Sequence, residues 1–227
     1  MGVSPGATGG FGAVAAVRGH RPDLRLLLVG EPSPHYDAAA GARAAGIADR
    51  VTFTGFVPDA ELPAYLGAVD LAFCLRWPTA RETSASWLRA VAAGLPTIVT
   101  DLAHQADIPT LDPRTWTIHC AAPAPEPPPP VAVGIDILDE DHSLRLALVR
   151  LAGDADLRAR LGAAGRAWFE QHHTLDHMTD DYERVLARAC SRAAPGAPLP
   201  PHLRPDPLGH ARRLAAEVGM SLEDLDG

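Results

Sequence analysis

The stretch RETSASWLR, residues 81–89, combines cationic and hydroxyl side chains at the predicted start of a helix. Apolar residues follow at helical spacing, Ser84 is a residue type that caps helices, and Gly94 ends the pattern. A helix N-terminus presents unpaired amides and a partial positive charge of about half a unit, which suit a phosphate group. Arg81 adds a cation suited to phosphate, and Thr83 adds a hydroxyl donor. The stretch therefore predicts a phosphate-binding turn, with ordinary helix capping as the alternative interpretation.

Short apolar runs alternate with short helical segments around this turn. Strands are predicted at residues 24–29, 51–55, 70–75 and 96–100, of which the first and last are expected to be fully buried. Helices are predicted at residues 35–46, at 59–69 with Asp59 as the cap, at 84–94, and over most of 141–189. This order predicts an α/β fold: a Rossmann-like parallel sheet with helices on both faces, followed by C-terminal helices.

The ends of the predicted strands are the places to look for a ligand. In parallel sheets covered by helices, ligands bind beyond the carboxyl ends of the strands. That rule points to residues 30–34, 55–58 and 77–86. The phosphate-binding turn is thus joined by two glycine-led segments, which begin at Gly30 and Gly55.

Charge and composition argue against several classes of protein. The 227-residue chain has a formal net charge of -8 and no basic stripe, which disfavours nucleic acid as a partner. No apolar run approaches the roughly 20 residues that span a bilayer, and the start lacks the basic region of a signal peptide. Cys74, Cys120 and Cys190 form no CxxC pair, which suggests buried or inert thiols in a reducing compartment. We therefore expect a cytoplasmic protein without a transmembrane segment.

A pair of histidines raises the question of a metal. His173 and His177 are four residues apart on a predicted helix and could hold zinc together with Asp176 or Asp180. No Glu lies between them as in HExxH, and an ordinary helical segment explains the stretch as well. We predict no metal.

Several other segments have a structural interpretation as well as a functional one. Asp101, His104 and Asp107 follow a predicted strand end and either line the cleft or form a surface loop. Residues 139–142, DEDH, are predicted to be a solvated helix start. GEPSPH after the first strand lacks the GxGxxG of a dinucleotide-binding oxidoreductase, and the absence of GxSxG leaves a hydrolase unsupported.

Proline-rich segments divide the second half of the chain. Residues 122–130 are predicted to form an extended surface loop, with a ligand for another domain as the alternative. Residues 194–207 have the composition of a linker, and residues 208–218 form a short amphipathic helix that either docks on another surface or stays loose. We predict one domain over residues 1–190 and a linker with a short helix over residues 191–227.

Four stretches carry a family resemblance: PDLRLLLVGEP, IADRVTFTGFVPDAELPAYLGAVDLAFCL, RAVAAGLPTIVT and LRARLGAAGRAWFEQHHTLDHMTDDYERVL. They cover most of residues 22–189, and the second is the most specific, because its order of strand, glycine, acidic helix and buried strand is hard to reach by chance. Together they resemble the C-terminal, donor-binding half of family 4 (group 1) glycosyltransferases. The resemblance implies one half of a GT-B fold, with residues 1–190 as a Rossmann-like nucleotide-sugar-binding domain.

The resemblance also implies where a nucleotide-sugar donor binds. The base is expected near the loop 55–57, the diphosphate over the turn 81–86, and the ribose over the following helix. The implied donor-binding residues are Gly30, Gly55, Phe56, Val57, Arg81, Glu82, Thr83, Ser84, Ala85 and Arg89. The resemblance implies a retaining, metal-independent transfer with no cofactor other than the nucleotide sugar as substrate. No residue is assigned a catalytic role.

The chain departs from the family at several of these positions. Members usually carry a glutamate at the opening of the turn and a second one, on ribose hydroxyls, along the helix. Alignment on RAVAAGLP places Arg81 and Arg89 there, with Glu82 one place off, and an arginine cannot accept hydrogen bonds as a carboxylate does. Some relatives carry a GETS-like turn, which RETS resembles. Counting back further places Pro5 and Gly6 at the usual Lys-Gly.

Two hypotheses follow from the resemblance and the departures. The first is a glycosyltransferase domain that transfers a sugar from a nucleoside diphosphate to an unknown acceptor. It is expected to be incomplete alone and to need a separate N-terminal acceptor-binding half, because proximity and a closed cleft supply much of the rate. The alternative is a degenerate, non-catalytic, glycosyltransferase-like binding or interaction module.

The phosphate role of the turn can be tested at its first residue. We expect Arg81→Ala to weaken the binding of a nucleoside diphosphate, because it removes a cation that pairs with phosphate. Calorimetric titration measures the dissociation constant, and a constant equal to that of the unaltered chain would remove Arg81 from the site.

Overall fold

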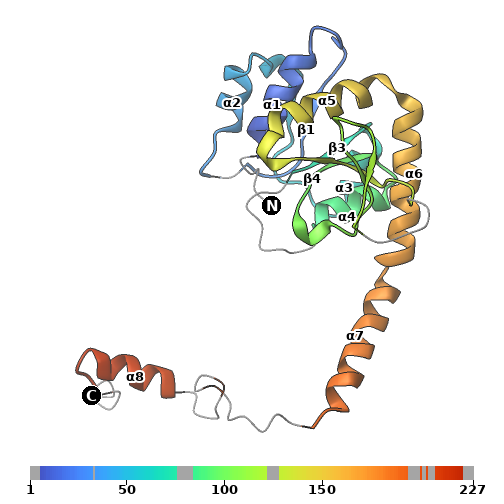
Figure 1. Cartoon of the computed structure of the whole chain (residues 1–227). Coiled ribbons are helices and arrows are strands. Elements are labelled where there is room, and N and C mark those ends of the chain that lie inside the picture. The colour runs from blue at the N-terminus through green and yellow to red at the C-terminus, as the bar shows by residue number, and fades with distance from the viewer. Residues whose placement is uncertain are drawn as a thin grey trace. The chain divides into compact units, whose positions relative to one another are not determined.

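The computed structural model describes residues 6–32, 34–75, 84–121, 128–193, 200, 203 and 208–221 (Figure 1). The chain falls into two compact units, Met1–Met178 and Thr179–Gly227. The predicted division between residues 190 and 191 stays a prediction.

A five-stranded, mostly parallel sheet lies at the centre of the first unit. Its strand order is β3-β4-β7-β5-β6, and the pair β5–β6 is antiparallel. Every residue of the two neighbouring strands β4 and β7 is buried. The strands are β3 (Ala72–Cys74), β4 (Thr97–Thr100), β5 (Thr110–Leu111), β6 (Ile118–His119) and β7 (Ala132–Ile135).

Strands β1 (Leu26–Leu28) and β2 (Val51–Phe53) form a separate parallel pair. The prediction that the first strand is buried on both faces is wrong. All three residues of β1 are half-buried and Val29 after them is 38% exposed. The reason is that the pair is only two strands wide, and Leu26 and Leu28 pack against the main core on one side.

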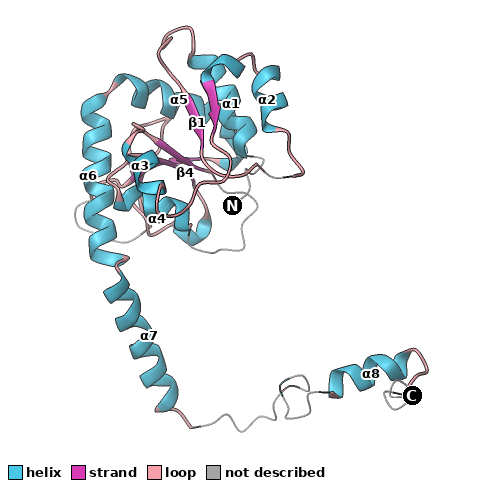
Figure 2. Ribbon diagram, turned by 180° about the vertical axis from the view of Figure 1, so that it is seen from behind, coloured by secondary structure: helices cyan, strands magenta, loops and turns pink. Residues whose placement is uncertain are grey.

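Three helices cover one side of the sheets: α1 (Gly6–Val17), α2 (Ala38–Ala44) and α5 (Glu140–Gly153). Helices α1 and α5 lie side by side in Figures 1 and 2 and pack closely on each other. The main core runs through them and continues onto the sheet. Its largest buried side chains include Phe11, Val14, Val17, Ile98, Ile135, Leu144, Leu148, Leu151 and Leu161.

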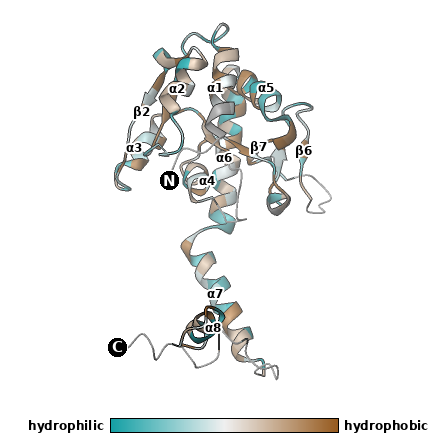
Figure 3. Ribbon diagram, turned by 90° about the vertical axis from the view of Figure 1, so that its left-hand side faces the viewer, coloured by the Kyte–Doolittle hydropathy of each residue, from teal (hydrophilic) through white to brown (hydrophobic). Residues whose placement is uncertain are grey.

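Helices α4 (Ala85–Ala92) and α6 (Ala155–His172) enclose a second, smaller core. Trp87 and Val91 of α4 pack there with Val99 of β4 and with Val131 and Ala132. Helices therefore lie on both faces of a mostly parallel sheet, and the predicted α/β, Rossmann-like fold is confirmed. In Figure 3 the ribbon of β7 is brown, in agreement with its four buried residues.

Helix α2 ends just before Gly46, as predicted, whereas α3 does not start where the sequence predicted. Asp37 caps α2 by accepting a hydrogen bond from the Ala40 amide at 2.8 Å, and Gly46 beyond the helix has a φ of 66°. The prediction of Asp59 as a helix cap is wrong. Helix α3 (Leu62–Gly67) begins after Glu61, with proline in its first turn, and the Asp59 carboxylate bonds elsewhere.

The predicted helical region 141–189 consists of α5, α6 and part of α7 (Leu175–Cys190), with breaks at Asp154 and His173. The prediction that His173 and His177 share a helix is wrong, because His173 ends α6. Its ring packs on Trp168 with the ring centroids 4.4 Å apart, whereas His177 contacts the Thr174 hydroxyl. Burial, and then the neighbouring His172, lower the pKa of His173.

Several smaller elements complete the described chain. Single 3₁₀ turns are η1 (Ala48–Arg50), η2 (Ala103–Gln105) and η3 (Ile137–Asp139). Helix α8 (Gly209–Glu217) agrees with the helix predicted at 208–218. Residues 128–130 have no regular structure, as predicted, while 122–127 lie outside the described residues. None of the helices in the described part of the chain is long and apolar enough to cross a membrane.

The three cysteines all lie in the described part of the chain, and none of them forms a disulfide. Cys190 on α7 is exposed, because α7 buries none of its described residues, while Cys74 and Cys120 are half-buried. That the thiols are inert stays a prediction.

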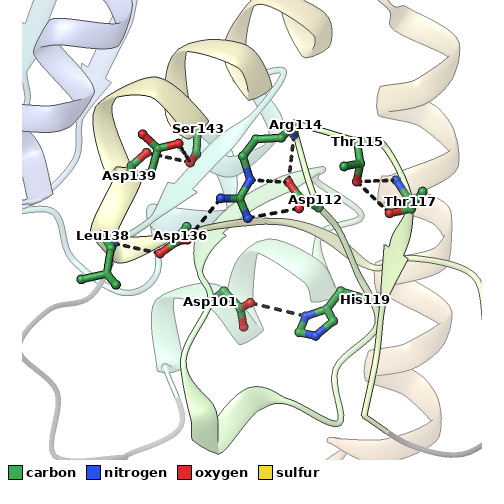
Figure 4. Close-up of polar contacts among 10 residues, drawn as sticks. All are labelled: Asp101, Asp112, Arg114, Thr115, Thr117, His119, Asp136, Leu138, Asp139 and Ser143. Atoms are coloured by element: carbon green, nitrogen blue, oxygen red, sulfur yellow. Dashed lines mark hydrogen bonds and ion pairs between the residues drawn. The ribbon is translucent and has the colours of Figure 1, made fainter.

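An ionic cluster fastens the hairpin between β5 and β6 to the sheet (Figure 4). Arg114 contacts Asp112 at 3.1 Å and Asp136 at 3.2 Å, and its amide donates to the Asp112 carboxylate. Asp112 follows β5 and Asp136 follows β7, so the guanidinium links the ends of two neighbouring strands. The hydrogen bonds from Arg114 hold the pKa of the Asp112 carboxyl below its ordinary value.

A glycine at the contact between α4 and α6 gives a first test of this architecture. A β-carbon at Gly162 would overlap the carbonyl oxygen of Gly94, which is backbone and cannot rotate away. We therefore expect Gly162→Ala to destabilise the unit by about 1–3 kcal/mol or more, the usual cost of overpacking. Urea unfolding measures the difference. In the control Gly153→Ala, where no atom lies within 4 Å, the helix preference of alanine should leave stability equal or raised by up to about 1 kcal/mol.

The ionic cluster predicts a pH dependence of stability. Because the folded state lowers the pKa of Asp112, the charged carboxylate stabilises the fold above the ordinary pKa of about 3.9, and the effect is lost as the pH falls below it. Asp112→Asn should be less stable than the unaltered chain at pH 7, and the difference should shrink below about pH 4. Thermal unfolding between pH 3 and 7 measures it, with the exposed Asp70→Asn as control. A difference that does not change with pH would contradict this role.

Candidate functional site

Two of the predicted donor-binding glycines meet just beyond the ends of β1 and β2. Gly30 and Gly55 form an isolated bridge and have φ values of 118° and 68°, which favour glycine. The Thr54 hydroxyl accepts a hydrogen bond from the Gly30 amide at 3.2 Å and donates one to the Gly55 carbonyl at 2.9 Å. The ends of the two strands are thereby held together at the edge where ligands bind in such sheets.

The loop that follows Gly55 presents an exposed aromatic ring. Phe56 is 75% exposed, and Val57 next to it is half-buried. An exposed ring has a flat apolar face on which a heterocyclic base can stack, at about 1–3 kcal/mol for each base in single-stranded nucleic acid complexes. These two side chains and Gly55 are the three residues predicted near the base.

Helix α4 begins as the sequence predicted. Ser84 is its N-cap, and the Ser84 Oγ accepts a hydrogen bond from the Trp87 amide at 3.3 Å. Ala85, also predicted in the site, is the first helical residue and is exposed. The Trp87 indole donates to the Thr97 hydroxyl of β4 at 3.0 Å and is 2% exposed, so the start of α4 is fixed by a buried contact.

Arg89 projects from α4 to the loop after β2 and pairs there with Asp59. Its Nη2 donates to Oδ2 of Asp59 at 3.3 Å, and its Nη1 lies 3.2 Å from Oδ1. The two parallel contacts form a bidentate pair. The structure thus brings together the segment predicted near the base and the helix predicted near the ribose. Asp59 thereby places a carboxylate beside Arg89, the position on α4 where the family resemblance implies a carboxylate.

Three predicted donor-binding residues, Arg81, Glu82 and Thr83, lie outside the described residues. They stay predictions. The same holds for Pro5 at the position of the usual Lys-Gly, whereas Gly6 begins α1.

A carboxyl group lies against the first half of α1. Glu140, at the start of α5, sits so close to Gly9 that a β-carbon there would overlap its Oε1. Burial, with repulsion from Asp141, raises the pKa of Glu140. Only part of the predicted solvated helix start is therefore solvated.

The loop after β4 contacts strand β6 and its flank. The Asp101 carboxylate lies 3.4 Å from Nδ1 of His119 (Figure 4), and the Asp101 amide donates to the Ile135 carbonyl at 2.8 Å. The Cys120 thiol donates to the Asp107 carbonyl at 3.4 Å. These contacts account for Asp101 and Asp107 as part of a folded loop, while the predicted role of either residue in the cleft stays a prediction. The His104 side chain is outside the described set.

Two residues of the candidate site escaped the sequence analysis. Thr54 was part of a predicted strand, and Asp59 was assigned to a helix cap. A threonine just before a glycine at a strand end could have been recognised as a hydroxyl that bonds local backbone. The partner of Asp59 is 30 residues away on α4, so no local pattern indicates it. Among the described residues, no group of three or more His, Cys, Asp or Glu side chains could hold a metal ion.

Comparison with known proteins now adds to this geometry. Residues 11–118 match the family model described as glycosyl transferases group 1. A 2-deoxystreptamine glucosyltransferase of Streptomyces kanamyceticus is 30% identical over 182 residues, which are 78% of this chain and 41% of the relative. The chain therefore spans about two fifths of the length of the curated relative that it matches.

Solved structures show the same fold. The C-terminal domain of a glycosyl transferase group 1 family protein from Francisella tularensis has a TM-score of 0.57 and 17% identity, covering 75% of this chain and 80% of that domain. A glycosyltransferase from Rickettsia africae has a TM-score of 0.62 and 13% identity, covering 85% of this chain and 46% of that one. At these identities the similarity is one of fold. Together with the family match over residues 11–118 and the curated relative, it supports a domain of the C-terminal type found in group 1 glycosyltransferases.

Proposed function

We propose that this domain binds the nucleoside-diphosphate sugar donor of a glycosyl transfer reaction. The observation that carries the proposal is the contact between Arg89 and Asp59, because it joins the loop after β2 to helix α4. Those are the segments for which the family resemblance implies base and ribose contacts. Phe56 follows Gly55, whose bridge to Gly30 joins this loop to the one after β1, and the two features add an exposed apolar ring and a fixed backbone.

Glycosyl transfer from a nucleoside diphosphate requires positive charge next to the diphosphate, which we propose lies at the start of α4. In glycosyl transfer the bond between the anomeric carbon and the diphosphate oxygen breaks, an acceptor hydroxyl bonds to that carbon, and the hydroxyl proton is released. Negative charge develops on the departing diphosphate and needs donors already in position. The partial positive charge at the start of α4, capped by Ser84, suits this role, and Arg81 is proposed to add a full charge.

We propose that a further, N-terminal half completes the enzyme. The chain spans about two fifths of its curated relative, and acceptor binding and exclusion of water require a second wall to the cleft. A location in the cytoplasm is proposed as well, since the three cysteines are unlinked.

A non-catalytic interaction module is the alternative. The observation in its favour is that Arg89 stands where the family resemblance implies a carboxylate, so the original ribose contact on α4 is absent. This alternative predicts that the domain has no affinity for nucleotides.

Calorimetric titration of the full chain with UDP, GDP and ADP in turn tests the proposal. We expect saturable binding of one of the three, because the base should select among them while the diphosphate contacts are shared. The titration is repeated with the N-terminal half of the Streptomyces relative added, since a closed cleft can strengthen binding. Arg43→Ala, an exposed arginine on α2, is the control and should leave the dissociation constant unchanged. Absence of binding with and without the added half would favour the non-catalytic module.

A further inference from the structure

The pair formed by Arg89 and Asp59 favours one orientation of the Asp59 carboxylate. Both oxygens of Asp59 are engaged by the two terminal nitrogens of one guanidinium, at 3.2 and 3.3 Å. A guanidinium fork that contacts both oxygens favours one plane of the carboxylate, which a single contact does not. The Asp59 side chain is nevertheless 81% exposed and that of Arg89 is 50% exposed, so the carboxylate is accessible to a ligand.

A contribution to folding stability does not explain the pairing of Arg89 with Asp59. Ion pairs between exposed side chains contribute little to folding, because solvent screens them and the side chains lose freedom. The core beneath α4 is made by Trp87 and Val91, on another face of the helix from Arg89. The pair therefore adds geometry at the surface rather than stability.

The carboxylate still has acceptor capacity. A carboxylate offers about four acceptor positions, and the guanidinium occupies two of them. Among the described residues, Asp59 has no other hydrogen-bond partner. A vicinal diol offers two hydroxyl donors close together, and an acidic side chain on ribose hydroxyls is the usual solution in α/β nucleotide sites.

We propose that Asp59 is the carboxylate that accepts hydrogen bonds from the ribose hydroxyls of the donor nucleotide, and that Arg89 positions it. The inference rests on the proposed function. The carboxylate has moved from α4 to the loop after β2, and the residue on α4 has become its cationic support. Asp59 is thus a ribose-selective binding residue and Arg89 a positioning residue.

A comparison of two ligands separates this role from others. The full chain is titrated with whichever of UDP, GDP and ADP binds, and with the 2′,3′-dideoxy form of that nucleotide. We expect the ribonucleotide to bind roughly tenfold more tightly, because only it can donate to the carboxylate. Asp59→Asn should remove most of this preference while it leaves the affinity for the dideoxy nucleotide nearly unchanged.

Variants of Arg89 test the positioning role. Arg89→Lys keeps the charge but lacks the fork, so it should lower the ribonucleotide preference and leave the dideoxy affinity nearly unchanged. The double variant Asp59→Asn with Arg89→Glu returns a carboxylate to α4 and should recover part of the preference. Asp49→Asn, an exposed aspartate just before β2, is the matched control and should behave as the unaltered chain.

The outcomes are distinguishable. Binding of a ribonucleotide and its dideoxy form with equal affinity, or an equal loss for both in Asp59→Asn, overturns the inference and leaves the proposed function standing. A double variant without any recovered preference overturns the relocation from α4. Absence of binding of all three nucleotides, with and without the added N-terminal half, overturns the proposed function and this inference together.

Discussion

The fit of helix α4 between strand β4 and helix α6 is the constraint on which the candidate site depends. Trp87 is almost fully buried, and its indole donates to Thr97 at the start of β4. At the other end of the helix, Gly162 of α6 allows that helix to reach the backbone of Gly94. Because buried contacts fix α4 at both ends, its exposed face has one position, and Arg89 on that face points to a defined place. Surface charges are not needed to hold the helix.

The loop after β2 has a different kind of support. Its glycine-led start is fixed by the Gly30–Gly55 bridge and the Thr54 hydroxyl, but from Phe56 to Asp59 the side chains are exposed or half-buried. A segment with so few buried contacts takes its position from polar contacts at its edge. Among the described residues, the ion pair between Asp59 and Arg89 is such a polar contact. Because both side chains are exposed, it contributes about 0–1 kcal/mol to stability. So small a contribution is enough to favour one orientation of the exposed Asp59 carboxylate, while buried contacts hold α4 in place.

Local patterns in the sequence were enough to predict the elements whose ends are marked by turn or capping residues. The strands at 26–28, 51–53, 72–74 and 97–100 and the cap at Ser84 were predicted, because apolar runs and turn residues mark them. Strands β5, β6 and β7 were not, although β7 is central and its valine and isoleucine run is typical of a strand. Two-residue strands have no period to detect, and the proline-rich stretch before β7 hides its start. Asp59 was misassigned for a similar reason: its spacing before a helix is local, whereas its bond to Arg89 is not.

An arginine in place of a carboxylate suggests decay of a binding site, but the surroundings of Arg89 argue for a rebuilt one. In a chain with 28 acidic and 20 basic residues, an arginine readily finds some carboxylate, so pairing alone carries little weight. The location carries more. The partner lies across the candidate site, on the loop that begins at the bridged ends of β1 and β2, and not on a neighbouring turn of the same helix. The contact places a carboxylate and a guanidinium between α4 and the loop after β2, as the proposed donor site requires.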